Sequence, residues 1–310
     1  MHGLYLAASL ACAAPGPAEE VSLSTLPERF WEHWGDGRAE IDAYALVTPR
    51  YGELRQGRAV LVFVTEDFTD AQRVKSDGGH EDEYPVLKLN EMRDFQTGIY
   101  DYSVMTSSFV RIDGRGTPGL PVKVAMSMQE WCGQVWEQVL PRGDALAFTG
   151  HSYFDGEADQ QRSLAIPRGG VLLDAMPIYV RGVTGALVAP GATAEVPVLP
   201  TLMSGRFAHE AIAWTTATVR RARETTAIDV PAGTFEVFDV TSDVKGGAVT
   251  TWRIESTWPH RIVAWSTSEG EHAELLGSER LTYWELNSQG NETKLTELGL
   301  PVPRALPRRP

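Results

Sequence analysis

Hydrophobic and polar positions alternate with a period of two along several short segments of this chain. Between Val122 and Gln129, apolar side chains occupy every second position, and Lys, Ala, Ser and Gln stand between them. This alternation predicts a strand with one buried face. The β-branched run Val60–Val64 is apolar throughout, which predicts a strand buried on both faces. Phe109–Ile112 leads through a glycine-rich turn into the alternating strand and indicates a hairpin.

The second half of the chain also consists of short apolar segments separated by turn residues. Strands are predicted at Phe235–Val240, Thr250–Ile254, Ile262–Trp265 and Leu281–Leu286. The segment Trp131–Leu140 has apolar residues at helical spacing, but it directly continues a strand pattern, and we favour a strand there. Several short strands at close spacing predict a mainly β fold of curved antiparallel sheets, as a half-barrel or a sandwich, with a few short helices.

A short helix is predicted before the first strand. Thr25–Glu28 has the pattern of a capping box with proline in the first turn. Leu26, Phe30 and Trp34 then fall on one helical face, which would pack on a hydrophobic surface.

The sequence also divides into two β-rich halves. We place the first at residues 21–167 and the second at residues 201–300. Residues 168–200 are rich in glycine and proline, and we expect them to connect the halves with a short helix around 171–180. Residues 301–310 are expected to be a frayed, disordered tail.

Residues 1–20 are expected to be an export signal or a lipoprotein tether. Leu4–Pro15 is an apolar run ending in small residues. It falls short of the roughly 20 residues that span a bilayer but suits a secretory signal. Ala11–Ala13 fits a cleavage site, and Leu10–Cys12 resembles a bacterial lipobox, in which Cys12 is acylated. A short N-terminal strand is the alternative. The sequence thus predicts an exported protein, periplasmic or held at the outer membrane as a lipoprotein.

Net charge limits the class of binding partner, and the cysteine content limits disulfide formation. The formal net charge is −13, and nucleic-acid binding would need a clustered basic face, so we expect no nucleic-acid partner. Contact with a membrane is expected only through a lipid anchor. The chain has two cysteines, Cys12 and Cys132, and if Cys12 is lipidated or removed, no internal disulfide can form.

No cofactor is predicted. Gly114–Gly119 matches G-x-G-x-x-G, but a dinucleotide site needs this motif to open a helix. Here Pro118 lies inside the motif and a strand follows, which favours a hairpin loop.

One segment has some features of a catalytic or metal site. Gly150–Phe154 approaches the G-x-S-x-G nucleophile elbow, but Phe154 replaces the closing glycine that the strained turn requires. His151 is followed by alternating carboxylates, which can converge on Ca²⁺. An acidic turn with a structural histidine explains the same residues, namely Asp155, Glu157 and Asp159. We assign no catalytic residue and no metal ligand.

Tryptophans are the remaining candidates for function. Those in or beside predicted strands are Trp131, Trp136, Trp214, Trp252, Trp258, Trp265 and Trp284. Core packing is the favoured interpretation, and the walls of an apolar cavity in a curved sheet are the alternative. The candidate ligand-binding residues are Trp131, Trp136, Trp252, Trp265, His151, Asp155, Glu157 and Asp159.

Parts of the chain resemble known families. Tyr51–Arg55, Val62–Glu66, Gln129–Gly133 and His151–Asp159 resemble a family of uncharacterised exported bacterial proteins, sometimes labelled "septum formation inhibitor Maf". The Ser-x-Ser-Pro-Arg-Arg signature of Maf pyrophosphatases is absent. Val230–Phe238, with the following Thr-Trp and Ile-Val-Ala-Trp segments, is similar to a domain of unknown function related to the lipoprotein carriers LolA and LolB. The resemblance implies a curved antiparallel sheet and an envelope location, but no catalytic residue.

Two functions follow as hypotheses. The first is a non-catalytic envelope protein that binds an apolar or amphiphilic ligand, or a protein partner, on a curved sheet. The second is a hydrolase or metal-dependent enzyme that uses His151 with the three carboxylates of the acidic turn. We favour the first because no nucleophile–base pair or metal-ligand set has its usual spacing.

Overall fold

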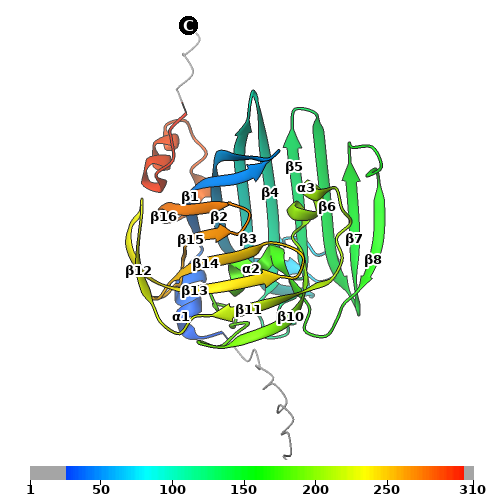
Figure 1. Cartoon of the computed structure of the whole chain (residues 1–310). Coiled ribbons are helices and arrows are strands. Elements are labelled where there is room, and N and C mark those ends of the chain that lie inside the picture. The colour runs from blue at the N-terminus through cyan, green and yellow to red at the C-terminus, as the bar shows by residue number, and fades with distance from the viewer. Residues whose placement is uncertain (1–25, 304–310) are drawn as a thin grey trace, which may run out of the picture.

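The computed structural model describes residues 26–303. The expected export signal, the acylation of Cys12 and residues 304–310 of the expected C-terminal tail lie outside the described residues. Within 26–303 the chain is mainly β, as predicted, with one large curved sheet and a few short helices (Figure 1).

The sheet has 16 strands. Their bounds are β1 Ala39–Arg50, β2 Glu53–Thr69, β3 Glu83–Thr97, β4 Tyr100–Arg111, β5 Lys123–Glu130, β6 Gly133–Arg142, β7 Ala145–Ser152, β8 Gln160–Ala165, β9 Val171–Leu172, β10 Thr193–Leu199, β11 Thr215–Arg221, β12 Thr226–Val230, β13 Gly233–Val244, β14 Val249–Glu255, β15 Ile262–Thr267 and β16 His272–Leu281. The helices are α1 Glu28–Trp34, α2 Met176–Tyr179 and α3 Leu202–Ala208, with 3₁₀ segments η1 Leu173–Ala175, η2 Tyr283–Glu285 and η3 Asn291–Leu298.

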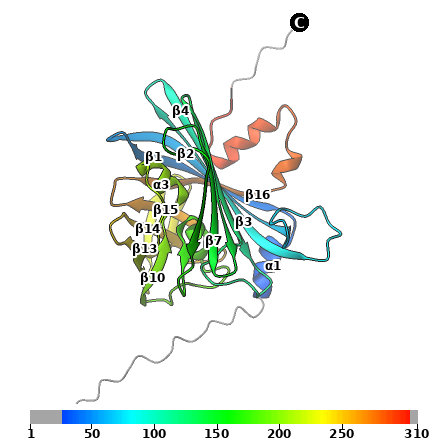
Figure 2. The same cartoon turned by 90° about the vertical axis from the view of Figure 1, so that its right-hand side faces the viewer.

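Strand order shows how the two halves of the chain join. It runs β8-β7-β6-β5-β4-β3-β2-β1-β16-β15-β14-β13-β11-β10-β9, with β12 on β13. β1 pairs with β2 on one side and with β16 on the other, so the first and last strands are neighbours in the middle of the sheet. All pairs are antiparallel apart from β9 with β10. The two predicted β-rich halves are therefore parts of one continuous sheet. We call strands β1–β8 the first wing and strands β9–β16 the second wing, and the two wings curve toward each other (Figure 2).

Most predicted strands are confirmed. Val60–Val64 lies within β2, and Val62 and Phe63 of this run are buried although they point to opposite faces. The hairpin of β4 and β5 is present, and the G-x-G-x-x-G segment forms its loop. Gly119 in that loop has a φ of +82° and lies against Val171, so a side chain there would meet both strain and a clash. Residues 133–142 form β6, the strand favoured over a helix.

The prediction of a strand at Leu281–Leu286 is wrong. β16 ends at Leu281, and the chain then turns into the 3₁₀ segment η2. The apolar residues that suggested a strand, Tyr283 and Trp284, are largely exposed. Alternation alone could not show that they pair with no neighbouring strand.

The predicted N-terminal helix is α1, and its apolar face is confirmed. Phe30 and Trp34 are fully buried, and Leu26 packs against the same cluster. Thr25, the first residue of the expected capping box, lies outside the described residues, and among residues 26–303 the N-cap is Pro27. Packing of its apolar face stabilises this seven-residue helix, which is too short to be stable alone.

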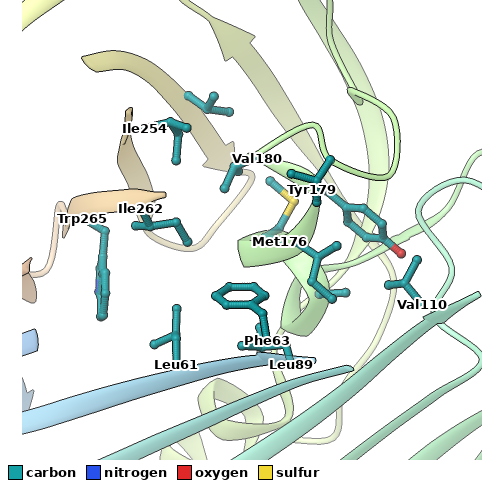
Figure 3. Close-up of a cluster of buried hydrophobic side chains, with 14 of the residues drawn as sticks. Leu61, Phe63, Leu89, Val110, Met176, Tyr179, Val180, Ile254, Ile262 and Trp265 are labelled. Atoms are coloured by element: carbon teal, nitrogen blue, oxygen red, sulfur yellow. The ribbon is translucent and has the colours of Figure 1, made fainter. Parts of the chain in front are cut away.

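Residues 168–200 were expected to be a connection, and in the structure they supply much of the central core. Met176 and Val180 lie between Phe63 of β2 and Ile254 and Ile262 of the opposite wing (Figure 3). Buried side chains of residues 168–200, which we call the plug, form one cluster with side chains of both wings. The plug changes direction at turns formed by glycines with positive φ, namely Gly169, Gly182, Gly185 and Gly191.

An ion pair inside the core ties the plug to the sheet. Arg181 is 1% exposed, and its Nη1 lies 2.6 Å from Oε1 of Glu40 on β1. His33 of α1 contacts the other oxygen of Glu40 at 2.8 Å. Burial would raise the pKa of Glu40, but Arg181 and His33 lower it to about 2. Removing one partner would leave a buried charge unpaired, which makes this pair a strong constraint on the plug.

The outer face of β1 and β2 is covered by the C-terminal segment. Leu295 and Leu298 of η3 pack with Ile41 and Val62, on the side of the sheet away from β10 and β13–β15 (Figure 2). Among residues 26–303, no helix is both long and apolar enough to cross a membrane. Cys132 lies in the β5–β6 turn as an exposed, free thiol.

Candidate functional site

The two wings enclose a cavity of about 860 Å³. One wall comes from β1–β4 and the other from β13–β15 together with Glu271, which precedes β16, while α3 and the loop that follows it also line the cavity. A volume of this size is in the range of small-molecule sites, roughly 300–1,000 Å³. Its polar and aromatic lining includes Thr48, Arg50, Glu91, Arg93, Asp174, Phe207, Trp214, Trp252, Trp265 and Glu271.

Three tryptophans line this cavity. Trp252 on β14 and Trp265 on β15 are direct cross-strand partners, so their side chains share one face of the sheet. Trp265 is 4% exposed, and Trp252 and Trp214 are half-buried. Trp265 belongs to the central core cluster, Trp252 and Trp214 pack against core clusters, and all three also border the cavity.

A hydrogen-bonded network fixes the indole of Trp265. Its Nε1–H donates to Oε1 of Glu271 at 2.9 Å, and Thr48 Oγ1 donates to the other oxygen at 2.8 Å. Arg93 donates to Glu271 at 2.8 Å and to Glu91 at 2.6 Å. Burial would raise the pKa of Glu271, but the Arg93 guanidinium beside it holds that pKa below its ordinary value. The polar part of the cavity is thus internally paired and rigid.

Asp174 adds a carboxyl group to the cavity wall without an ion-pair partner among the described residues. It is 5% exposed, and its oxygens accept the backbone N–H of Leu202 at 3.1 and 3.3 Å. Burial raises the pKa of Asp174 to about 8. Burial therefore favours the protonated carboxyl group, which can donate one hydrogen bond.

Two tryptophans of the predicted ligand-binding set lie elsewhere. Trp131 is 70% exposed in the β5–β6 turn, where its Nε1 donates to Asp101. Trp136 on β6 is 37% exposed and stacks on His151, with ring centroids 5.7 Å apart. Both are outside the cavity, and core packing does not describe them either.

The histidine and carboxylates of the acidic turn separate into two unconnected contacts. His151 Nδ1 lies 2.8 Å from Asp159, and both side chains are more than half exposed. Glu157 instead contacts Arg206 and His209 near α3. No group of three metal-binding side chains occurs between residues 26 and 303. Asp155 is exposed and has no side-chain bond among the described contacts.

The serine of the elbow-like segment makes no hydrogen bond to a histidine among the described residues. Ser152 Oγ donates to Glu157 at 3.3 Å, and the nearest histidine of that cluster, His209, contacts the same carboxylate. A carboxylate thus separates serine and histidine, whereas nucleophile activation needs the histidine in contact with the serine.

Comparison with known proteins adds little to this geometry. No family model matches the chain, and no curated protein matches it. A similar solved structure is a β-barrel-like protein of domain of unknown function DUF1849 from Brucella abortus. It is 10% identical, with a TM-score of 0.47, over 79% of this chain and 98% of that one. At 10% identity and a TM-score of 0.47, this likeness supports no inference about the cavity.

Several cavity residues were not recognised in the sequence. Arg50 on β1 and Arg93 on β3 alternate with outward residues, and this period-two spacing is a signal that they share a face with buried positions, whereas Glu271 lies in the turn before β16. Isolated charged residues on strands usually face solvent, so the pattern did not distinguish them. Asp174 lies in the segment interpreted as a connection.

Proposed function

We propose that this protein binds an apolar or amphiphilic small molecule in the cavity between its two wings, without acting on it chemically. The observation that carries the proposal is the cavity of about 860 Å³ with Trp214, Trp252 and Trp265 in its walls. Large aromatic side chains usually complete a packed core, and here the same side chains also border an open space. A few convergent polar groups beside apolar walls are typical of ligand sites.

The rigid network around Trp265 supports binding over a merely incomplete core. A void left by poor packing would be lined by adaptable side chains, whereas Trp265 is held by Glu271, which Thr48 and Arg93 hold in turn. A wall that is fixed before the ligand arrives lowers the entropic cost of binding.

A neutral fluorophore tests this proposal without assuming a headgroup. N-phenyl-1-naphthylamine should bind the wild-type protein and brighten, and Trp252→Ala should weaken its binding about fivefold to tenfold because one wall of the site is lost. Trp136→Ala is the matched control, since it removes a strand tryptophan outside the cavity and should leave binding unchanged. Absence of binding by folded wild-type protein, or equal losses in both variants, would exclude the cavity as the site.

An envelope location belongs to the same proposal and is supported by the apolar run before Cys12. Expression in a bacterium with radiolabelled palmitate should label the wild-type protein and not Cys12→Ala. Labelling of both proteins alike would argue against an acylated Cys12 while leaving the ligand site untouched.

A further inference from the structure

Arg50 lies at the mouth of the cavity, and aromatic rings hold its guanidinium in place. The group lies over the rings of Phe207 at 4.3 Å, Tyr51 at 4.4 Å and Tyr102 at 5.3 Å. Nη1 donates to the carbonyl of Phe207 and Nη2 to the hydroxyl of Tyr102, both at 3.3 Å. The side chain therefore has a fixed position on the border of the cavity.

The charge of Arg50 is not balanced by any carboxylate among residues 26–303. Its Nε is buried and has no hydrogen-bond acceptor. Arg93, on the wall of the same cavity, has both Glu91 and Glu271 as partners. A guanidinium carries five N–H donors in a planar fork, so Arg50 still has capacity for an oxyanion.

The other charges of the cavity determine where an anion would lie. In the interior, two carboxylates face one guanidinium, Arg93, which leaves a net negative charge there. At the mouth, Lys245, Glu210 and Glu269 are exposed on loops and make no ion pair among the described residues. Arg50 is the fixed cation of this border, so an anionic group would be repelled from the interior and held at Arg50.

We propose that the ligand is an amphiphile with one acidic oxyanion head, a carboxylate or a phosphate monoester. Resting on the function proposed above, this inference places the head on Arg50 and the apolar chain inward, against Trp252 and Trp265. Two oxygens of a carboxylate or of a phosphate accept two parallel N–H bonds from a guanidinium, and such charge-assisted bonds are roughly twice as strong as neutral ones.

Calorimetry with three ligands of one chain length tests the head. Dodecanoate, dodecyl phosphate and dodecanol are titrated below their aggregation concentrations at low ionic strength. Wild-type protein should bind at least one of the two acids about tenfold more tightly than dodecanol, and the tighter acid identifies the head as carboxylate or phosphate. Arg50→Gln should abolish this preference while dodecanol binds as before, and Arg50→Lys should keep part of it.

The matched control is Arg58→Gln, which removes the same charge from an outward position on β2 and should change nothing. Equal binding of acids and alcohol by wild-type protein would overturn the assignment of the head, as would an equal loss of all three ligands in Arg50→Gln. If dodecanol and the neutral fluorophore also fail to bind, the proposed function itself is wrong, which is a different outcome from a failure of the head alone.

Discussion

Asp174 shows how one buried carboxyl group can make the stability of the fold depend on pH. In the folded protein burial raises its pKa to about 8, far above the ordinary value of 3.8. At a pH between 3.8 and about 8, the carboxyl group of Asp174 keeps its proton in the folded protein and releases it in the unfolded chain. The free energy of unfolding contributed by this group therefore falls as pH rises from about 4 to about 8, and is constant above that.

Asp174→Asn should remove this dependence. Asparagine is neutral at all pH values and keeps an oxygen that can accept the N–H of Leu202. Relative to wild type, the variant should gain more than about 1 kcal/mol in unfolding free energy between pH 5 and pH 8, measured by urea denaturation. Asp174→Ala should lose the same pH slope but be less stable than Asp174→Asn at every pH, since the N–H of Leu202 loses its acceptor. Parallel pH curves for wild type and Asp174→Asn would contradict the raised pKa.

At the scale of elements, α3 is a short helix that depends on its neighbours. It has seven residues, too few to be stable alone. Thr201 caps its N-terminus by accepting the N–H of Ser204 at 3.1 Å. Near its C-terminus, Nη1 of Arg206 donates to both oxygens of Glu157 in the β7–β8 turn, at 3.0 and 2.8 Å. Glu157 of the acidic turn, which the sequence offered as an alternative catalytic or metal site, therefore stabilises the position of α3 beside the cavity.

Glu157→Ala should destabilise the protein by about 2–4 kcal/mol, because it leaves the buried guanidinium of Arg206 without a counter-charge. The measurement is chemical denaturation, and the fluorophore affinity should fall as well if α3 shifts. Asp155→Ala, an exposed change in the same turn, is the control and should stay within about 0.5 kcal/mol of wild type. If both variants were equally stable, α3 would be held by apolar contacts alone.

For the whole molecule, the decisive contact is between strands from the two ends of the described chain. β1 pairs with β16 from Ala39 to Val47, and one buried cluster combines Leu61 and Phe63 with Val219 and Ile254 of the other wing. Neither wing can bury its concave face by itself, and β1 without β16 would expose an unpaired edge in the middle of the sheet.

The segments 21–167 and 201–300, produced separately, should therefore fail to fold. We expect each to lack the near-ultraviolet circular dichroism of packed aromatic side chains, whereas the full chain should unfold in one transition by fluorescence and far-ultraviolet circular dichroism alike. A segment with a cooperative transition of its own would show that the wings are independent domains.

The local pattern of the sequence determined the secondary structure well. Alternation at Val122–Gln129 and the apolar run Val60–Val64 specify strands, because a pleated backbone sends successive side chains to opposite faces. Trp34, four residues after Phe30, specifies the buried face of α1 for the same kind of geometric reason. The prediction failed at Leu281–Leu286, where apolar residues leave the sheet.

Only the tertiary structure decided which of these faces meets a cavity. Trp136 and Trp265 have similar surroundings in the sequence, but one is on the outside of its wing and the other borders the cavity. Alternation assigns residues to two faces without stating which face turns inward. That choice is made when β1 pairs with β16, more than 200 residues away, and when the plug enters between the wings. Arg50 is a candidate for binding because this closure brings Phe207 against it, and no local pattern contains that contact.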